Sequence, residues 1–419
     1  MDASYIIPRS QHNVSKTNIN VNALKVLNRI NSSGFKAYLV GGSVRDLLLG
    51  KRPKDFDVAT NATPNQIKKL FRNARIIGRR FKLVHILYGR EVIEVATFRG
   101  NDEIESANQI TNESGMLVRD NVYGTLEDDV WRRDFTINSL YYNLEDSSII
   151  DFTGGVNDVR QGVVRLLGNA LTRYQEDPVR MLRAVRFSAK LHFTLAPETA
   201  APIKTLSPLL ENISSSRLFD EITKLSQCGE VERAFHLMME HGLFACLFKQ
   251  TDRLLNSDYP VKALLGMALE STDTRIRNNK PITPAFIFAV LLWFPLKVRA
   301  IELQNTENSP PLAALERAMT DVIVLQNQVV TVPKRFTQMM REIWLLQFRF
   351  QKRTGNRAYN LLAHPRFRAA YDFLILRSLV NDETKALAEW WTIFQDVPEE
   401  KQKNMIDKLS NVKSDSQKQ

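Results

Sequence analysis

The sequence LVGGSVRD at residues 39–46 is the stretch that decides the fold expected for the first half of the chain. A short apolar run leads into Gly41 and Gly42 and then into a segment that can form a helix, which is a strand–turn–helix pattern. Backbone N–H groups at such a turn can approach phosphate oxygens, and Arg45 would add a positive charge. Paired glycines also occur at ordinary turns. The pattern therefore predicts a turn that is able to hold a polyphosphate.

The sequence KDFDV at residues 54–58 follows closely. On a strand, residues i and i+2 point to the same face, so Asp55 and Asp57 share one face while Phe56 and Val58 point to the other, into a core. Two carboxylates held together in this way suit Mg²⁺, which prefers oxygen ligands. The same Asp-x-Asp pattern is common in turns, but its place just after the Gly-Gly turn favours the metal interpretation.

A third motif, RRDFTINSL, occupies residues 132–140. Arg132 and Arg133 suit triphosphate oxygens, Asp134 is a further carboxylate, and Asn138 can hydrogen-bond a ribose or phosphate. A solvated charged turn is the alternative. Glu94, within an apolar run, is either a further metal ligand or a paired structural glutamate.

The fourth motif, EDPVRMLRAVRF, occupies residues 176–187. Arg180, Arg183 and Arg186 recur every three residues and therefore line one side of a predicted helix. A pair formed by Asp177 and Arg180 could read the edge of a base, because a carboxylate accepts an exocyclic N–H and a guanidinium donates to a ring nitrogen. Adenine and cytosine present the same order of donor and acceptor, so this pair does not choose between them. Alternatively, Asp177 is an N-cap followed by Pro178 in the first turn.

The composition is that of a basic chain with several domains. Its 419 residues, 44% of them hydrophobic, suffice for about two to four packed units. A formal net charge of +11 favours polyanionic partners. The only cysteines, Cys228 and Cys246, predict neither a disulfide framework nor a zinc site, which fits the cytoplasm. No apolar run reaches the roughly 18 residues of a membrane span, and residues 285–294 are expected to form a buried helix.

The order of patterns predicts an α/β domain with a mixed sheet, followed by an all-α C-terminal half. Short apolar runs predict strands at residues 37–40, 56–59, 84–87, 92–96 and 148–151, and helical spacing begins at Val21. Beyond Arg160 helical patterns continue to the end. The predicted domains are a flexible arm (1–20), the α/β domain (21–160), a first helical region (161–250), a second helical region (251–330), a basic helical C-terminal region (331–409) and a disordered tail (410–419).

The segment at residues 331–368 carries nine Lys and Arg residues against one acid, a formal charge of +8. A solvated surface usually mixes signs, so this bias predicts contact with an RNA backbone. The candidate residues are Lys334, Arg335, Arg349, Lys352 and Arg353. The interleaved aromatic residues, including Trp344 and Phe350, fit a helical core better than base stacking.

In order and spacing the four motifs resemble the bacterial class II nucleotidyltransferases, a family that comprises CCA-adding tRNA nucleotidyltransferases and poly(A) polymerases. The motifs cover residues 24–190. The sequence IGRRFKLVHI at residues 77–86 and the helical second half look like the poly(A) polymerase branch. The resemblance implies a head, neck, body and leg arrangement with the palm in the head. It also implies template-independent transfer of AMP from ATP to RNA 3′-hydroxyl ends with two divalent ions, Mg²⁺ or Mn²⁺.

Residue by residue, the resemblance implies metal binding by Asp55 and Asp57, with Asp134 as a further active-site carboxylate. Its triphosphate site would contain Gly41, Gly42 and Arg45, and its nucleotide pocket would contain Asp177, Arg180 and Arg183. Family members often end in a long Arg-rich tail, whereas this sequence ends in a short Lys-containing one. The alternatives are a CCA-adding enzyme and, more distantly, an inactive RNA-binding protein. Retention of all three clustered carboxylates argues against inactivity.

Overall fold

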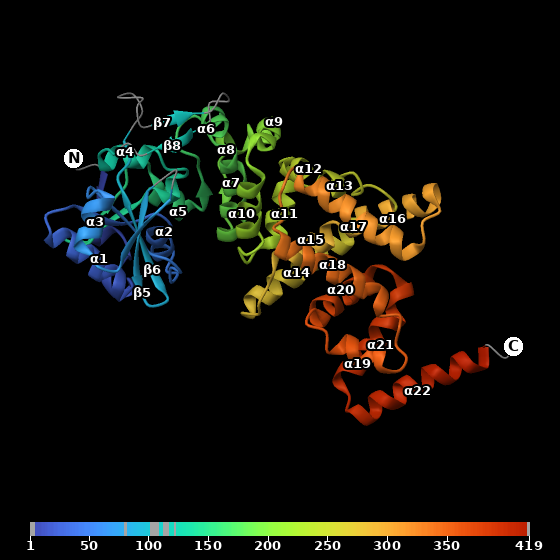
Figure 1. The fold of residues 1–419 in the computed structure, drawn as a ribbon. Coiled ribbons are helices and arrows are strands. Elements are labelled where there is room, and N and C mark those ends of the chain that lie inside the picture. The colour runs from blue at the N-terminus through green and yellow to red at the C-terminus, as the bar shows by residue number, and fades with distance from the viewer. Residues whose placement is uncertain (1–4, 79–81, 101–108, 112–116, 121–122, 417–419) are drawn as a thin grey trace. The chain divides into compact units, whose positions relative to one another are not determined.

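The computed structural model consists of two units (Figure 1). The first contains an eight-stranded sheet, and the second is a long series of helices. The structure describes residues 5–78, 82–100, 109–111, 117–120 and 123–416. The division falls between Leu209 and Leu210. The finer boundaries predicted at 160, 250 and 330 stay predictions.

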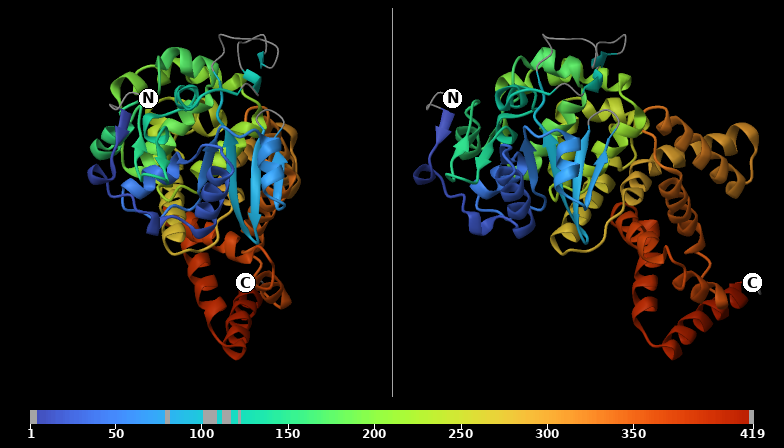
Figure 2. Two further views of the ribbon diagram at one scale, coloured as in Figure 1. Left: turned by 90° about the vertical axis from the view of Figure 1, so that its left-hand side faces the viewer. Right: turned by 60° about the vertical axis from the view of Figure 1, so that its left-hand side comes forward.

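The sheet of the N-terminal unit is mixed, as the sequence predicted. Only β3 and β6 run parallel, and every other neighbouring pair is antiparallel. Figure 2 shows the long strands β5 and β6, in light blue, side by side. From one edge to the other, the strands are β1 (Ile6–Ile7), β10 (Ile149–Ile150), β9 (Tyr141–Asn143), β2 (Ala37–Val40), β3 (Asp57–Thr60), β6 (Glu91–Thr97), β5 (Leu83–Tyr88) and β4 (Ala74–Ile77).

Helices cover the two faces of this sheet differently. On one face, α1 (Val21–Ser32) contacts β2, β3 and β6, and α3 (Pro64–Leu70) contacts β4 and β5. On the other face, α4 (Leu126–Trp131) buries Leu126 and Val130 against residues of β2, β3 and β9. Asp57 points to this second face, because it shares a face with Ala59, which lies in the same cluster.

The rest of the N-terminal unit positions the four motifs. Turns and short helices connect the sheet to α7, which carries the arginine series. These elements are α2 (Gly42–Leu48), β7 (Gln109–Thr111), β8 (Leu117–Asp120), the 3-10 helix η4 (Thr136–Asn138), α5 (Gly155–Gln161), β11 (Val163–Val164), α6 (Ala170–Glu176), α7 (Val179–Leu191), β12 (Thr194–Leu195), α8 (Pro197–Ala200) and α9 (Ile203–Leu206).

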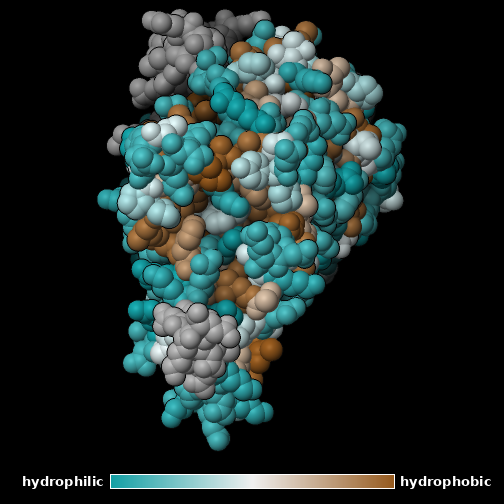
Figure 3. Space-filling view, turned by 90° about the vertical axis from the view of Figure 1, so that its right-hand side faces the viewer, coloured by the Kyte–Doolittle hydropathy of each residue, from teal (hydrophilic) through white to brown (hydrophobic). Residues whose placement is uncertain are grey.

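The C-terminal unit is helical throughout its described residues. Trp344, Phe350 and Trp391 are fully buried in it, which confirms the core assignment of the first two. On the face shown in Figure 3, hydrophobic side chains lie in small patches between hydrophilic ones. The helices are α10 (Ser215–Leu225), α11 (Val231–Glu240), α12 (Leu243–Leu247), α13 (Lys249–Asp252), α14 (Val261–Arg277), α15 (Pro284–Leu291), α16 (Trp293–Glu307), α17 (Pro311–Asn327), α18 (Lys334–Arg349), α19 (Asn356–Leu362), α20 (Phe367–Val380), α21 (Lys385–Asp396) and α22 (Glu399–Ser416).

The structure departs from the sequence expectations at both ends of the chain. The part of the predicted arm that is described packs on the sheet, because β1 pairs with β10 and the apolar side chains of Val14 and Ile19 are buried. Helix α22 continues through Ser416 into the predicted disordered tail, since adding a residue to an existing helix avoids the cost of nucleation. Strands β11 and β12 form a small parallel pair beyond Arg160, where no strand was expected.

Within the described residues, no helix has both the length and the apolar character that a membrane crossing requires.

Candidate active site

Asp55 and Asp57 lie where the sheet meets solvent. Asp57 is the first residue of β3, pairs in register with Val40 of β2 and Glu94 of β6, and is exposed. Asp55 is also exposed, whereas Phe56 and Val58 are buried. The alternation of exposed and buried side chains predicted from KDFDV is therefore present, and Asp55 lies just before the strand that begins at Asp57.

The surroundings of Asp57 disfavour the ionised form of its carboxylate. The surrounding protein removes water from the Asp57 carboxylate, and repulsion from Glu94 adds to this effect, so the pKa of Asp57 rises to about 6. Arg133 opposes the shift, and Asp55 contributes a smaller repulsion. Glu94 itself is near His85, with 3.3 Å between a carboxylate oxygen and Nε2. This arrangement fits a divalent cation, whose charge would relieve the repulsion.

The number of ligands fits magnesium as well. Among the described residues no group of three or more His, Cys, Asp or Glu side chains is gathered as a preformed metal cluster. Mg²⁺ is commonly held by one or two carboxylates together with substrate phosphates and water. Asp55 and Asp57 supply two such carboxylates on an open face.

The Gly-Gly turn brings the first motif next to the third. Gly41 has φ 73° and ψ −133°, a backbone conformation that favours glycine, and its N–H donates to the carbonyl of Leu140. A Cβ at Gly41 would lie 3.5 Å from Nη1 of Arg133. The turn therefore places backbone next to a guanidinium.

Arg45 is placed differently from the sequence expectation. Its side chain is only 3% exposed, and its guanidinium donates to Asp46 at 2.7 and 2.9 Å and to Asn138 at 2.6 Å. A buried guanidinium with these partners supports the turn from inside. The charge pattern could not reveal this, because Asp46 and Asn138 were not recognised as its partners.

A buried network holds Arg133 in position. Its Nη2 donates to Asp129 at 2.9 Å and its Nε donates to the hydroxyl of Tyr141 at 2.7 Å. Tyr141 in turn donates to the same Asp129 oxygen. Burial would raise the pKa of Asp129, but Arg133 and these hydrogen bonds lower it on balance. Asp129 therefore stays ionised and fixes the guanidinium beside Gly41.

Asp134 is enclosed by partners. It accepts hydrogen bonds from Arg183 Nε at 2.7 Å, from Asn138 at 3.2 Å and from the N–H of Phe135 at 2.9 Å. Burial would raise the pKa of Asp134, but Arg183 and the hydrogen bonds from Asn138 and Phe135 together lower it on balance. Its side chain is 12% exposed. Asp134 thus joins the third motif to helix α7.

The joint role predicted for Asp177 and Arg180 in reading a base edge stays a prediction, and each side chain also contacts the protein. Nη1 of Arg180 donates to Glu176 at 3.0 Å and to the carbonyl of Arg173 at 2.7 Å. An oxygen of Asp177 accepts from the N–H of Val179 at 3.3 Å, as expected for a residue that caps α7.

Arg173 of α6 links the junction between α6 and α7 to the third motif. It donates to Glu176 at 2.9 Å and to the backbone carbonyls of Arg132 and Arg133 at 3.2 and 2.6 Å. Arg132 donates to the carbonyl of Gly100. Neither Arg173 nor Asp129 was predicted from the sequence. Asp129 carries a recognisable signal, since it lies four residues before Arg133, which follows the end of α4.

The basic residues predicted to bind RNA are not equivalent. Lys334, Arg335, Arg349 and Lys352 are exposed. Arg353 is half-buried, with its guanidinium 5.3 Å from the ring centre of Trp390. Within the poly(A)-like segment 77–86, residues 79–81 lie outside the described residues.

Comparison with known proteins gives the family. Three family models match: Poly A polymerase head domain at residues 37–165, a probable RNA and SrmB-binding site of polymerase A at 192–267, and the polymerase A arginine-rich C-terminus at 307–419. Among solved structures, the Thermotoga maritima CCA-adding enzyme complexed with tRNA shares the fold, with a TM-score of 0.60 and 19% identity over 94% of this chain and 87% of that chain.

Curated relatives separate the two branches of the family. The chain is 49% identical to Poly(A) polymerase I of Salmonella typhi over 97% of this chain and 89% of that protein, and 44% identical to the Haemophilus influenzae protein of the same name over 93% and 88%. The CCA-adding enzyme of Lactobacillus gasseri is 40% identical over only 53% of this chain and 54% of that enzyme. With head, RNA-binding and C-terminal regions all matched, the chain belongs to the bacterial poly(A) polymerase family of nucleotidyltransferases.

Proposed function

We propose that this protein is a template-independent poly(A) polymerase that transfers AMP from ATP to the 3′-hydroxyl of RNA and releases pyrophosphate. The observation that carries the proposal is the open carboxylate pair, Asp55 and Asp57, in a chain 49% identical to Poly(A) polymerase I. The cytoplasm is the proposed compartment, and Cys228 and Cys246, which form no disulfide, fit its reducing conditions.

Asp55 and Asp57 would hold Mg²⁺ or Mn²⁺. When bound, such ions activate a hydroxyl nucleophile and neutralise charge on a phosphate leaving group. The protein's own part is to keep both carboxylates on one face and to orient the triphosphate. Arg133, fixed by Asp129 and Tyr141, is the guanidinium best placed to receive phosphate oxygens above the Gly41–Gly42 turn.

The start of helix α7 would receive the base. Asp177 and Arg180 stand at this corner, and Arg183 links it through Asp134 to the third motif. Because adenine and cytosine offer the same donor and acceptor order, the preference for ATP rests on the family and not on these two side chains. In the C-terminal unit, exposed Arg349 and Lys352 are proposed to contact the RNA backbone.

Nucleotide addition by the purified full chain tests the proposal. A labelled RNA with a free 3′-hydroxyl is incubated with Mg²⁺ and each nucleoside triphosphate separately, and an Asp55→Asn/Asp57→Asn double variant serves as the control. We expect long tails with ATP and none from the double variant. Efficient CTP incorporation that stops after a CCA end on tRNA would assign the chain to the CCA-adding branch instead.

A further inference from the structure

A basic pocket lies on the opposite side of β3 from the carboxylate pair. It has a volume of about 700 Å³, and its lining comes from the N-terminal segment, the start of α1 and the loop that precedes β3. Phe56 lines it, and Phe56 points away from the face that carries Asp55 and Asp57. The lining residues are Thr17, Asn18, Ile19, Asn20, Val21, Asn22, Gly50, Lys51, Arg52, Pro53, Lys54 and Phe56.

The charged side chains that line this pocket are all cations, and the nearest acid with a contact to the lining is Glu91, which accepts from the side chain of Asn22 at 2.6 Å. Lys51, Arg52 and Lys54 are exposed, and their side chains have no hydrogen-bond or ion-pair partner among the described residues. None of the described residues in the lining is acidic. In the sequence from Ala3 to Lys54 the single acid is Asp46, and Arg45 binds it at 2.7 Å. A surface that only has to stay solvated usually mixes signs.

The rest of the lining suits a phosphate-bearing strand. The first turn of α1 faces the pocket and adds the partial positive charge of a helix start. The cap residue Asn20 already accepts from the N–H groups of Asn22 and Ala23, so the helix supplies mainly its field. The side chains of Thr17 and Asn18 add polar groups able to hydrogen-bond sugars or phosphates.

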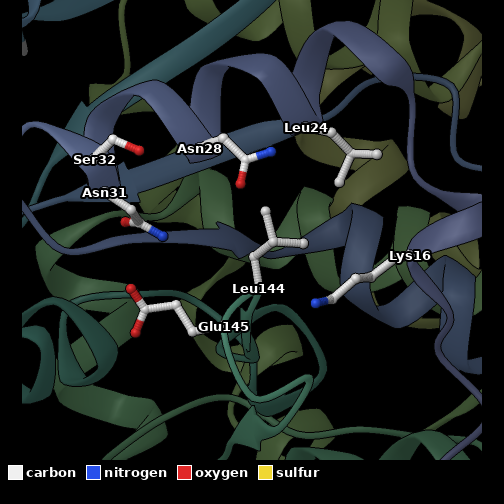
Figure 4. A pocket seen from close by; sticks show the side chains of 7 residues that line it. All are labelled: Lys16, Leu24, Asn28, Asn31, Ser32, Leu144 and Glu145. Carbon is white, nitrogen blue, oxygen red and sulfur yellow. The ribbon is translucent and has the colours of Figure 1, made fainter.

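The neighbouring hollow on α1 shows that this bias is local (Figure 4). Leu24 and Asn28 of α1 point toward Leu144 there, with Lys16 and Glu145 on either side of that leucine. This hollow measures about 480 Å³ and combines one cation with one anion. Two adjacent hollows on the same helix therefore differ in electrostatic character.

We infer that the basic pocket binds the phosphodiester backbone of the RNA substrate upstream of the 3′ end, by way of Lys51, Arg52 and Lys54. The inference rests on the proposed function, which brings the RNA 3′ end to Asp55 and Asp57. The loop that carries the three cations runs directly into that carboxylate pair. A strand whose end lies at the carboxylates can thus pass around the loop and place earlier phosphates in the pocket. The contact is independent of sequence, because it reads only phosphates.

Salt-dependent RNA binding tests this inference. A Lys51→Gln/Arg52→Gln double variant of the full chain is compared with a Lys68→Gln/Lys69→Gln variant, which removes two exposed charges from α3 of the same unit. Single-stranded RNA affinity is measured by fluorescence anisotropy without ATP over a range of salt concentrations. We expect the slope of log K against log salt to flatten by about 1.4 for Lys51/Arg52, as about 0.7 per lost phosphate contact predicts. The Lys68/Lys69 variant should keep the wild-type slope.

Several outcomes overturn the inference. Equal slopes of log K against log salt for the two double variants would show that Lys51 and Arg52 do not contact the RNA backbone. An unchanged RNA slope with a higher KM for ATP, or with weaker inhibition by added inorganic pyrophosphate, would assign the pocket to free polyphosphate. Since binding is measured without catalysis, its failure is separate from that of the proposed function. If the wild-type chain adds AMP but the Lys51→Gln/Arg52→Gln variant keeps the wild-type salt slope, only the pocket inference is wrong. If the variant has a flatter salt slope but the wild-type chain adds no AMP, only the proposed activity is wrong.

Discussion

Two regions of the N-terminal unit carry the carboxylates predicted to be catalytic, and these carboxylates differ in exposure and in their protein partners. Asp55 and Asp57 are exposed on an open face, where partial removal of water by the surrounding protein and repulsion from Glu94 raise the pKa of Asp57. Asp134 is 12% exposed and is held by Arg183, Asn138 and a backbone N–H. A carboxylate that lacks compensating partners is suited to bind a cation from solution, whereas one that is fully compensated is suited to hold protein elements together.

Removing the open pair should have the largest effect on activity. Asp55→Ala and Asp57→Ala should each lower the rate of AMP addition by at least about 10³-fold, because a metal that stabilises transition-state charge by several kcal/mol would be lost. Folding should be retained. Single-turnover extension assays measure the effect, with Glu127→Ala, an exposed acid of α4, as the control. Near wild-type activity of either variant would contradict the metal assignment.

Removing the enclosed carboxylate should chiefly affect stability. Asp134→Ala leaves the partly buried guanidinium of Arg183 without its partner, and breaking a buried ion pair costs about 3–5 kcal/mol. Because Arg183 is 30% exposed, we expect the lower end of that range. Urea unfolding monitored by circular dichroism provides the measurement. If Asp134→Ala unfolds at the wild-type urea concentration while Asp57→Ala is destabilised, the roles assigned to the two regions are reversed.

The network behind Arg133 should show an intermediate effect. Tyr141→Phe removes a hydrogen bond to Arg133, and a bond to a charged group contributes about 1.5–3 kcal/mol. We expect the KM for ATP to rise about tenfold or more, with a smaller change in kcat, because the guanidinium loses its fixed direction. Tyr142→Phe is a matched control, since the buried hydroxyl of Tyr142 has no hydrogen-bond partner in the part of the chain that the structure describes. Equal kinetic effects from the two substitutions would indicate a general packing effect.

The smallest expected effect is a pH-dependent change in stability. The pKa of Asp57 is about 6 in the folded protein, whereas its ordinary value is 3.8. Between these two pH values the unfolded chain loses the proton more readily than the folded protein, so the folded protein loses stability as the pH rises from about 3.8 to about 6. Asp57→Asn cannot ionise. In EDTA the melting temperature of Asp57→Asn should therefore exceed that of the wild type increasingly from pH 4 to pH 7, and added Mg²⁺ should narrow the difference. A difference that stays constant with pH would argue against strained carboxylates.

The sequence was most informative where a side chain's direction follows from local periodicity. The alternation of Asp55, Phe56 and Asp57 and the burial of Trp344 were predicted correctly because both depend on neighbours a few residues away. The roles of Arg45 and Arg180 depended on which carboxylate or amide each guanidinium meets. Arg45 meets Asn138, 93 residues away, and a contact at that separation cannot be inferred from the local sequence.

Likewise, the strand β1 could not be recognised from Ile6 and Ile7 alone, because two residues establish no period. Its pairing partner, β10, lies more than 140 residues further along the chain. Contacts of this kind are created by the tertiary fold, and a single sequence does not record them.

The turn at Gly41 also has a consequence for how this protein can change. A methyl group at Gly41 would meet its neighbours at 3.5 and 3.6 Å, which is ordinary contact distance, so available space does not exclude a larger residue. Handedness does, because φ 73° with ψ −133° is a conformation that L-amino acids avoid and that their mirror images would adopt readily. Ribosomal synthesis offers no mirror-image residue. The L-configuration of the amino acids that the ribosome uses, more than crowding, therefore restricts this position to glycine.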